Sequence, residues 1–167
     1  YKQKFNDLVA IQQRVGLDHE SGLMGELRQA AKQLEERLEA LNQDALSVVL
    51  LQLRRAEKDF QLRKDSSYVE RFNVLMLQFT QQLNSDDSSK ALAMRYNQSF
   101  NALVAGMQQI GLNEKEGVTG EMRAAIHNTE TSLKELESKT AQAIAASVSA
   151  TQQLAIMVFI AVLASVL

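Results

Sequence analysis

The sequence contains no cysteine, no proline and no tryptophan. Without cysteine, the chain has no disulfide bonds, no thiol catalysis and no zinc–thiolate site. Because proline breaks regular helices, its absence favours long helices and disfavours a loop-rich enzyme. Aromatic residues make up only 5% of the chain. The net charge of −2 provides no general attraction to nucleic acid, so we expect no nucleic-acid partner.

The two ends of the sequence lie inside structured-looking stretches. Tyr1 stands within a helical pattern, and Leu167 stands within an apolar run. We therefore expect a fragment truncated at both ends. Its 167 residues suffice for one domain or two small stacked modules.

The stretch 23–64 carries the strongest helical signal. Its apolar residues recur at steps of three and four, which is typical of a helix in a bundle or coiled coil. This seam consists of Leu27, Ala30, Leu34, Leu38, Leu41, Ala45 and Val48. We expect one continuous helix, about 60 Å long at 1.5 Å per residue. Similar patterns predict further helices over 1–15, 68–83, 91–110 and from about 118 to the chain end.

Polar or glycine-bounded segments separate these predicted helices. They are 16–22, 65–67, 84–89 and 111–117, and Ser66 or Ser67 is suited to cap the helix that follows.

The chain also repeats itself at a constant offset. Residues 1–10 align with 96–105, and the alignment continues without a gap into the two glycine-bounded turns. The matched pairs include Gly16 with Gly111, Gly22 with Gly117, Gly25 with Gly120 and Arg28 with Arg123. A repeated helix–turn–long-helix unit predicts two similar modules.

The short connections force neighbouring helices to be antiparallel. We therefore predict an all-α fold of two stacked four-helix bundles that share long helices and that lack one helix before Tyr1. In this scheme 1–150 form one helical domain, with 1–44 mainly in a membrane-proximal module and 45–136 mainly in a distal module.

The tail predicts a membrane helix. No charged residue follows Lys139, and 154–167 is apolar except for Ser165. That run is shorter than the roughly 20 residues that span a bilayer, but it is cut by the chain end. A buried core helix is the other interpretation. We favour the membrane, with 151–167 as the start of a transmembrane helix, because the other predicted helices are amphipathic and this run is not.

Catalytic motifs are missing. His19 lies in a charged turn and His127 on a helix, without the partners that a hydrolase or metal site requires. Glu57 and Asp59 are two residues apart and face different sides of a helix. We therefore expect no enzyme activity, no cofactor and no metal.

The arginines provide the candidate ligand site. Arg54 and Arg55 follow an apolar stretch, and Arg123 lies in the first turns of the last helix. In the antiparallel arrangement the end of the helix 23–64 faces the start of the last helix, which would bring these arginines together. A guanidinium binds both oxygens of a carboxylate, so we predict a small-acid site formed by Arg54, Arg55 and Arg123. Arg28, the repeat counterpart of Arg123, is the candidate for the second module. The other interpretation is that these arginines form surface ion pairs, such as Arg55–Asp59 and Asp59–Arg63.

The block 53–63, followed by Tyr68, Val69 and Phe72, resembles the periplasmic sensor region of methyl-accepting chemotaxis proteins. The doubled Gly-Leu…Gly-x-x-Gly-Glu-x-Arg turn resembles their helical bimodular sensor domain in particular. The resemblance implies a homodimer anchored in the bacterial inner membrane, with its sensor region in the periplasm. It also implies recognition of small organic acids, including citric acid cycle intermediates and acetate.

Two alternatives stay open at this point. The same architecture serves as the sensor region of membrane histidine kinases, which are enzymes. A ligand-free helical adaptor would also have this periodicity.

Overall fold

The computed structural model describes residues 2–83 and 87–166, and for residues 87 and 163–166 it describes the backbone alone. These residues form helices and no strand, as the composition predicts. The helices are α1 (Lys2–Val15), α2 (Gly22–Ala40), α3 (Asp44–Arg63), α4 (Ser67–Gln82), α5 (Asp87–Ile110) and α6 (Gly117–Val166). Residues 84–86 of the predicted polar segment 84–89 lie outside the described residues. The chain divides into two compact units, Tyr1–Arg123 and Ala124–Leu167.

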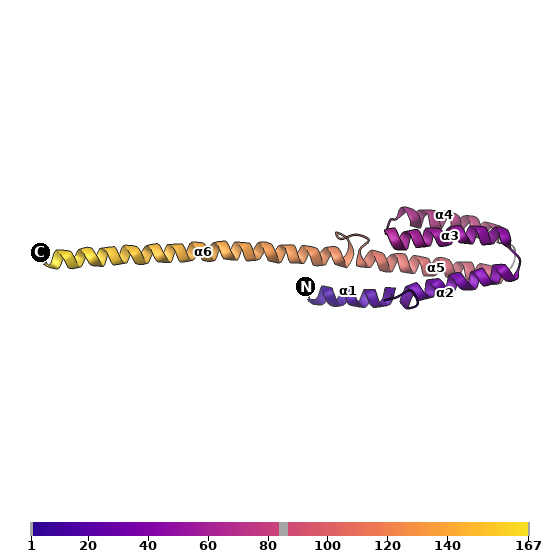
Figure 1. The fold of residues 1–167 in the computed structure, drawn as a ribbon, viewed down its shortest axis with the longest axis horizontal. Coiled ribbons are helices and arrows are strands. Elements are labelled where there is room, and N and C mark those ends of the chain that lie inside the picture. The colour runs from indigo at the N-terminus through magenta and orange to yellow at the C-terminus, as the bar shows by residue number, and fades with distance from the viewer. Residues whose placement is uncertain (1, 84–86, 167) are drawn as a thin grey trace. The chain divides into compact units, whose positions relative to one another are not determined.

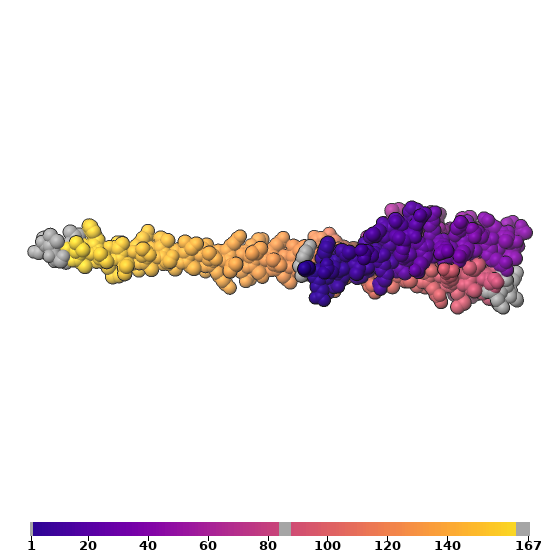
Figure 2. Space-filling view, turned by 90° about the horizontal axis from the view of Figure 1, so that it is seen from below, coloured from indigo at the N-terminus to yellow at the C-terminus, as the bar shows by residue number. Residues whose placement is uncertain are grey.

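The first unit contains a four-helix bundle. Helices α2, α3, α4 and α5 run alternately in opposite directions, and α2 packs mainly on α5 while α3 packs mainly on α4 (Figure 1). Figure 2 shows α2, in indigo to purple, alongside α5 in pink. The short connections between these helices enforce this antiparallel order.

Aromatic rings occupy the centre of the bundle. Phe72 stacks on Phe100 with ring centroids 3.8 Å apart, and it meets Tyr96 edge to face at 5.4 Å. Phe60 meets Phe100 edge to face at 5.8 Å. These rings come from α3, α4 and α5, so they join three helices in one core.

The prediction of one helix over 23–64 is wrong. Helix α2 ends at Ala40, and α3 begins at Asp44 and folds back along α2. The backbone between them has the hydrogen bonds of a Schellman motif: the Gln43 amide donates to the Leu38 carbonyl at 3.0 Å, and the Asn42 amide donates to the Glu39 carbonyl at 3.0 Å. Asn42 has a φ of 52°, a left-handed conformation that asparagine tolerates.

The predicted apolar seam is buried only up to the same reversal. Leu27, Ala30, Leu34 and Leu38 are buried, whereas Leu41, Ala45 and Val48 are exposed. In α3 the buried positions are instead Leu46, Leu50, Leu53, Ala56, Glu57 and Phe60. The spacing of three and four continued by coincidence across a reversal of the chain.

The repeat is visible in the backbone of the two glycine-bounded turns. Gly16 and Gly111 have φ values of 121° and 115°, and Gly22 and Gly117 have values of 56° and 57°. Such positive angles favour glycine, which has no Cβ to clash. The Asp18 carboxylate accepts a hydrogen bond from the Glu20 amide in the first turn, and the Asn113 side chain accepts one from the Lys115 amide in the second.

The first helices of the two repeat copies, α1 and α5, lie side by side and run in opposite directions. Arg14 donates a hydrogen bond to Gln109, and these two residues occupy equivalent positions of the repeat. Since α1 packs on α5, a local pseudo-twofold axis passes between the two helix ends.

A second stacked bundle stays a prediction. Among the described helices, α1 packs mainly on α5 and α2, and Lys4 of α1 also pairs with Glu121 of α6. Phe5 and Val9 of α1 are exposed, whereas their repeat counterparts Phe100 and Val104 are buried. Helix α2, which the prediction assigned mainly to the membrane-proximal module 1–44, belongs to the observed bundle.

The second unit is the remainder of α6. Within the described residues, α6 is the one helix long and apolar enough to cross a membrane, and none of its apolar window is buried. Its exposed apolar side chains include Leu154, Ile156, Met157, Val158, Phe159, Ile160 and Val162.

Candidate functional site

A basic hollow lies between α2, α3 and the first glycine-bounded turn. Its volume is ≈ 270 Å³. Arg54, Lys58 and Gln61 line it from α3, where their spacing of four and three residues puts them on one face of the helix. Arg28 and Met24 line it from α2, and His19 lines it from the turn. The reversal at 41–43 creates this site, because it returns α3 to the beginning of α2.

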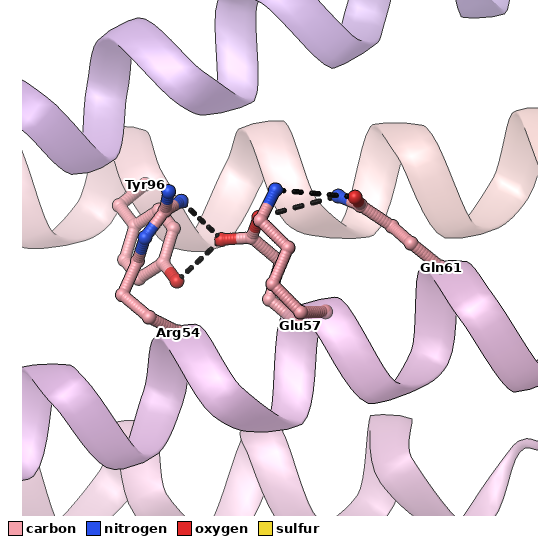
Figure 3. A network of polar contacts seen from close by, with 5 residues as sticks. Arg54, Glu57, Gln61 and Tyr96 are labelled. Carbon is pink, nitrogen blue, oxygen red and sulfur yellow. Dashed lines mark hydrogen bonds and ion pairs between the residues drawn. The ribbon is translucent and has the colours of Figure 1, made fainter. Parts of the chain in front are cut away.

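The buried carboxylate of Glu57 is bound by Arg54 and Gln61, which also line the hollow (Figure 3). Glu57 is 0% exposed, and its oxygens are held by four donors. Arg54 Nη1 donates to Oε2 at 2.6 Å, and the Tyr96 hydroxyl donates to the same oxygen at 2.8 Å. Gln61 Nε2 donates to Oε1 at 3.2 Å, and Lys58 Nζ lies 2.9 Å from it.

This network satisfies the requirement that a buried charge be paired and hydrogen-bonded. Burial raises the pKa of the Tyr96 hydroxyl, and the neighbouring Glu57 carboxylate raises that pKa further, while Arg54 acts in the opposite direction. Tyr96 therefore stays protonated and donates. The network ties α3 to α5 at the wall of the hollow.

Part of the positive charge of the hollow is already compensated. Arg54 and Lys58 share the carboxylate of Glu57, and Arg28 Nη1 lies 3.6 Å from Glu20. His19 also lies 3.6 Å from Glu20. The cations are Arg28, Arg54 and Lys58, and the carboxylates are Glu20 and Glu57. One positive charge is therefore in excess.

A larger depression lies on α2 and shares Arg28 with the hollow. Its volume is ≈ 490 Å³, and its charged lining residues are Glu20, Glu26, Arg28 and Lys32. Because its carboxylates and cations balance, it offers no net attraction for an anion. The basic hollow is the better candidate.

The three arginines predicted to form one pocket do not do so. Arg54 lines the hollow with its side chain 27% exposed. The side chain of Arg55 is 77% exposed and lies 3.9 Å from Asp59, and Arg63 lies 3.6 Å from the same carboxylate. Both ion pairs expected from the spacing are therefore present.

Arg123 also lies on the surface, with its side chain 62% exposed and paired with Glu114. The pocket was predicted on the assumption that the end of a continuous helix 23–64 meets the start of α6. Since the chain reverses at 41–43, Arg54 meets the start of α2 instead, and its partner across the hollow is Arg28. Arg28, predicted for the second module, belongs to this site.

Sequence reasoning missed Lys58, His19, Glu57 and Tyr96. A signal for Glu57 was available: it stands four residues after Leu53 and three before Phe60, on the buried stripe of α3. An acidic residue on such a stripe requires cationic or hydrogen-bonding partners.

Among the side chains that the structure describes, no group of three or more potential metal ligands is present. The chemistry of the hollow is that of arginine and lysine, which bind anions. No protein family, no curated protein and no solved structure matches this chain.

Proposed function

We propose that this chain is the extracytoplasmic ligand-binding region of a chemotaxis transducer. It binds a small organic acid in the hollow formed by His19, Arg28, Arg54 and Lys58. Binding shifts the bundle helices slightly, and α6 passes the shift through the bacterial inner membrane. Helix displacements of about 1–2 Å are an established switching mode in proteins.

The observation that carries this proposal is the convergence of Arg28, Arg54 and Lys58 on one hollow. Two helices and a turn supply the basic groups, so an anion bound there contacts several elements at once. A site with this geometry responds to its ligand by a change in helix packing.

The membrane part of the proposal rests on α6. Its segment 140–166 carries no charged residue, and the apolar side chains that the structure describes there, up to Val162, are exposed. Exposed apolar surface of this extent favours a bilayer or partner helices over water. We propose a homodimer in which α6 and α1 pair with a second copy, because both carry exposed apolar side chains.

The test is calorimetry with the full chain in lipid nanodiscs, using acetate, short monocarboxylates and dicarboxylates as ligands. Arg28→Gln removes a cation from the hollow without disturbing the buried Glu57. Charge-assisted hydrogen bonds contribute about 1.5–3 kcal/mol, so we expect at least a tenfold loss of affinity.

Arg123→Gln is the matched control. Arg123 occupies the equivalent position of the repeat and likewise pairs with a glutamate, but it does not line the hollow. We expect its affinity to equal that of the unaltered chain. Equal losses in both variants would refute the hollow as the site, and no binding of any acid would refute the transducer proposal.

A further inference from the structure

A second, apolar hollow adjoins the basic one. Its volume is ≈ 160 Å³, and it shares two lining residues, Met24 and Gln61, with the basic hollow. Its other lining residues are Gln12, Val15, Lys64, Met107, Ile110 and Gly111. Because Met24 and Gln61 border both hollows, a molecule that occupies both would lie against these two side chains.

Four of the eight residues that line the apolar hollow have apolar side chains, and this part of its wall suits a hydrocarbon group. Val15 and Met107 are buried core residues, and Met24 and Ile110 pack partly buried against the same core. Methionine side chains are flexible and polarizable, so two of them adapt to groups of different shape. The two volumes together fall within the range of small-molecule sites, about 300–1,000 Å³.

The charges of the basic hollow suit a ligand with a single carboxylate. The excess of one positive charge over Glu20 and Glu57 matches a monoanion at neutral pH. A second carboxylate would have to enter the apolar hollow, where Lys64 is the one cationic lining residue among those described. Lys64 is exposed, so an ion pair with it contributes only about 0–1 kcal/mol, less than the cost of moving a carboxylate out of water onto Met24, Met107 and Ile110.

From this juxtaposition we propose that the ligand is a monocarboxylate with an apolar body of several carbons. The carboxylate binds Arg28, Arg54 and Lys58, and the hydrocarbon part lies against Met24, Met107 and Ile110. This inference rests on the proposed function and narrows its ligand class. Acetate leaves the apolar hollow unfilled, and a dicarboxylate places its second charge there.

The test is calorimetry with the full chain in lipid nanodiscs, titrated with acetate, propionate, butyrate, pentanoate and succinate. Nanodiscs avoid free detergent, which would compete for an apolar hollow. Each added methylene buries about 30 Å² of apolar surface, so we expect affinity to rise about three- to fourfold per carbon until the hollow is full. Succinate is expected to bind more weakly than butyrate, which has the same number of carbons.

A pair of methionine variants locates the hydrocarbon. Met24→Gln keeps the length of the side chain and makes the shared wall polar, so we expect the gain in affinity per added methylene, from acetate to pentanoate, to shrink. Met94→Gln is the control, because Met94 is exposed on α5 and lines neither hollow. It should bind the whole series as the unaltered chain does.

The outcomes separate the two proposals. If acetate and pentanoate bind with equal affinity, or succinate binds more tightly than butyrate, the apolar extension is overturned while the acid-binding site stands. If none of the acids binds, the function proposed above fails as well.

Discussion

At the scale of single residues, Glu57 decides the character of the site. It is buried on the inner face of α3, and four donors from α3 and α5 hold its oxygens. Arg54 therefore balances the negative charge of Glu57 and also lines the hollow. A guanidinium has five N–H donors, which makes this double use chemically possible.

The sequence predicted Arg54 as a site residue but not its partners. Arg54 and Arg55 are adjacent and chemically identical, and only the packing of α3 distinguishes a hollow-lining side chain from an exposed one. Tyr96 and Glu57 are 39 residues apart, and local patterns do not report such long-range contacts.

The Tyr96–Glu57 hydrogen bond predicts a specific alkaline sensitivity. The pKa of Tyr96 is raised in the folded chain, chiefly by burial, above its ordinary value of 10.0. The unfolded chain therefore releases this proton first, and the free energy of unfolding falls as the pH rises past about 10. The expected contribution is about 1.4 kcal/mol per pH unit.

Tyr96→Phe removes this contribution. Urea unfolding of both forms, measured between about pH 8 and 11, should show a difference in stability that diminishes above about pH 10. Lysines titrate in both forms and cancel in the comparison. A difference that stays constant with pH would contradict the buried Tyr96–Glu57 arrangement.

At the scale of elements, the reversal at 41–43 determines where the site lies. The sequence predicted the boundaries of α1, α4 and the two glycine-bounded turns closely, because glycines and polar residues interrupt the apolar pattern there. At 41–43 the spacing of apolar residues continues by chance. The signals that could have revealed the break are Asn42, which accepts a left-handed conformation, and Asp44 in the first turn of α3.

Substitution of Asn42 tests this reversal. Asn42→Ala places an alanine in the left-handed conformation, where we expect a loss of about 1 kcal/mol in the free energy of unfolding. Asn42→Gly should preserve stability, because glycine adopts that conformation without strain. Gln43→Ala is the control, since Gln43 has a negative φ of −93°.

Thermal or urea unfolding measures these differences. A continuous helix over 23–64 would give the opposite order, because alanine is the best helix former and glycine costs about 1 kcal/mol in a helix interior. Asn42→Gly more stable than Asn42→Ala supports the reversal, and the inverse order contradicts it.

At the scale of the whole molecule, the apolar end of α6 is the feature that bears on the proposed membrane anchor. The sequence already indicated this end through its lack of charge after Lys139. The sequence alone could not show whether the apolar stretch of α6 is buried within the chain. The structure buries none of the apolar window within the chain, which weakens the interpretation as a core helix.

Charged substitutions in this window test membrane integration. Val158→Arg combined with Phe159→Arg places two charges in the apolar run, each costing about 2.5–3.5 kcal/mol near the centre of a membrane helix. We expect the fraction of chain that resists alkaline extraction from membranes to fall sharply. Leu133→Arg combined with Leu136→Arg is the matched control, because these two leucines are equally exposed but lie among charged residues. Loss of integration in both pairs, or in neither, would contradict a membrane span at the end of α6.

The contact between Tyr96 and Glu57 also gives the chain an internal optical probe. With no tryptophan and three tyrosines, its near-ultraviolet emission comes from tyrosine alone. Tyr96 and Arg54 both donate hydrogen bonds to Glu57 Oε2. We therefore expect the fluorescence yield of Tyr96 to change when the contact between Arg54 and Glu57 changes. An acid that draws Arg54 toward the hollow will therefore change the fluorescence of the unlabelled protein.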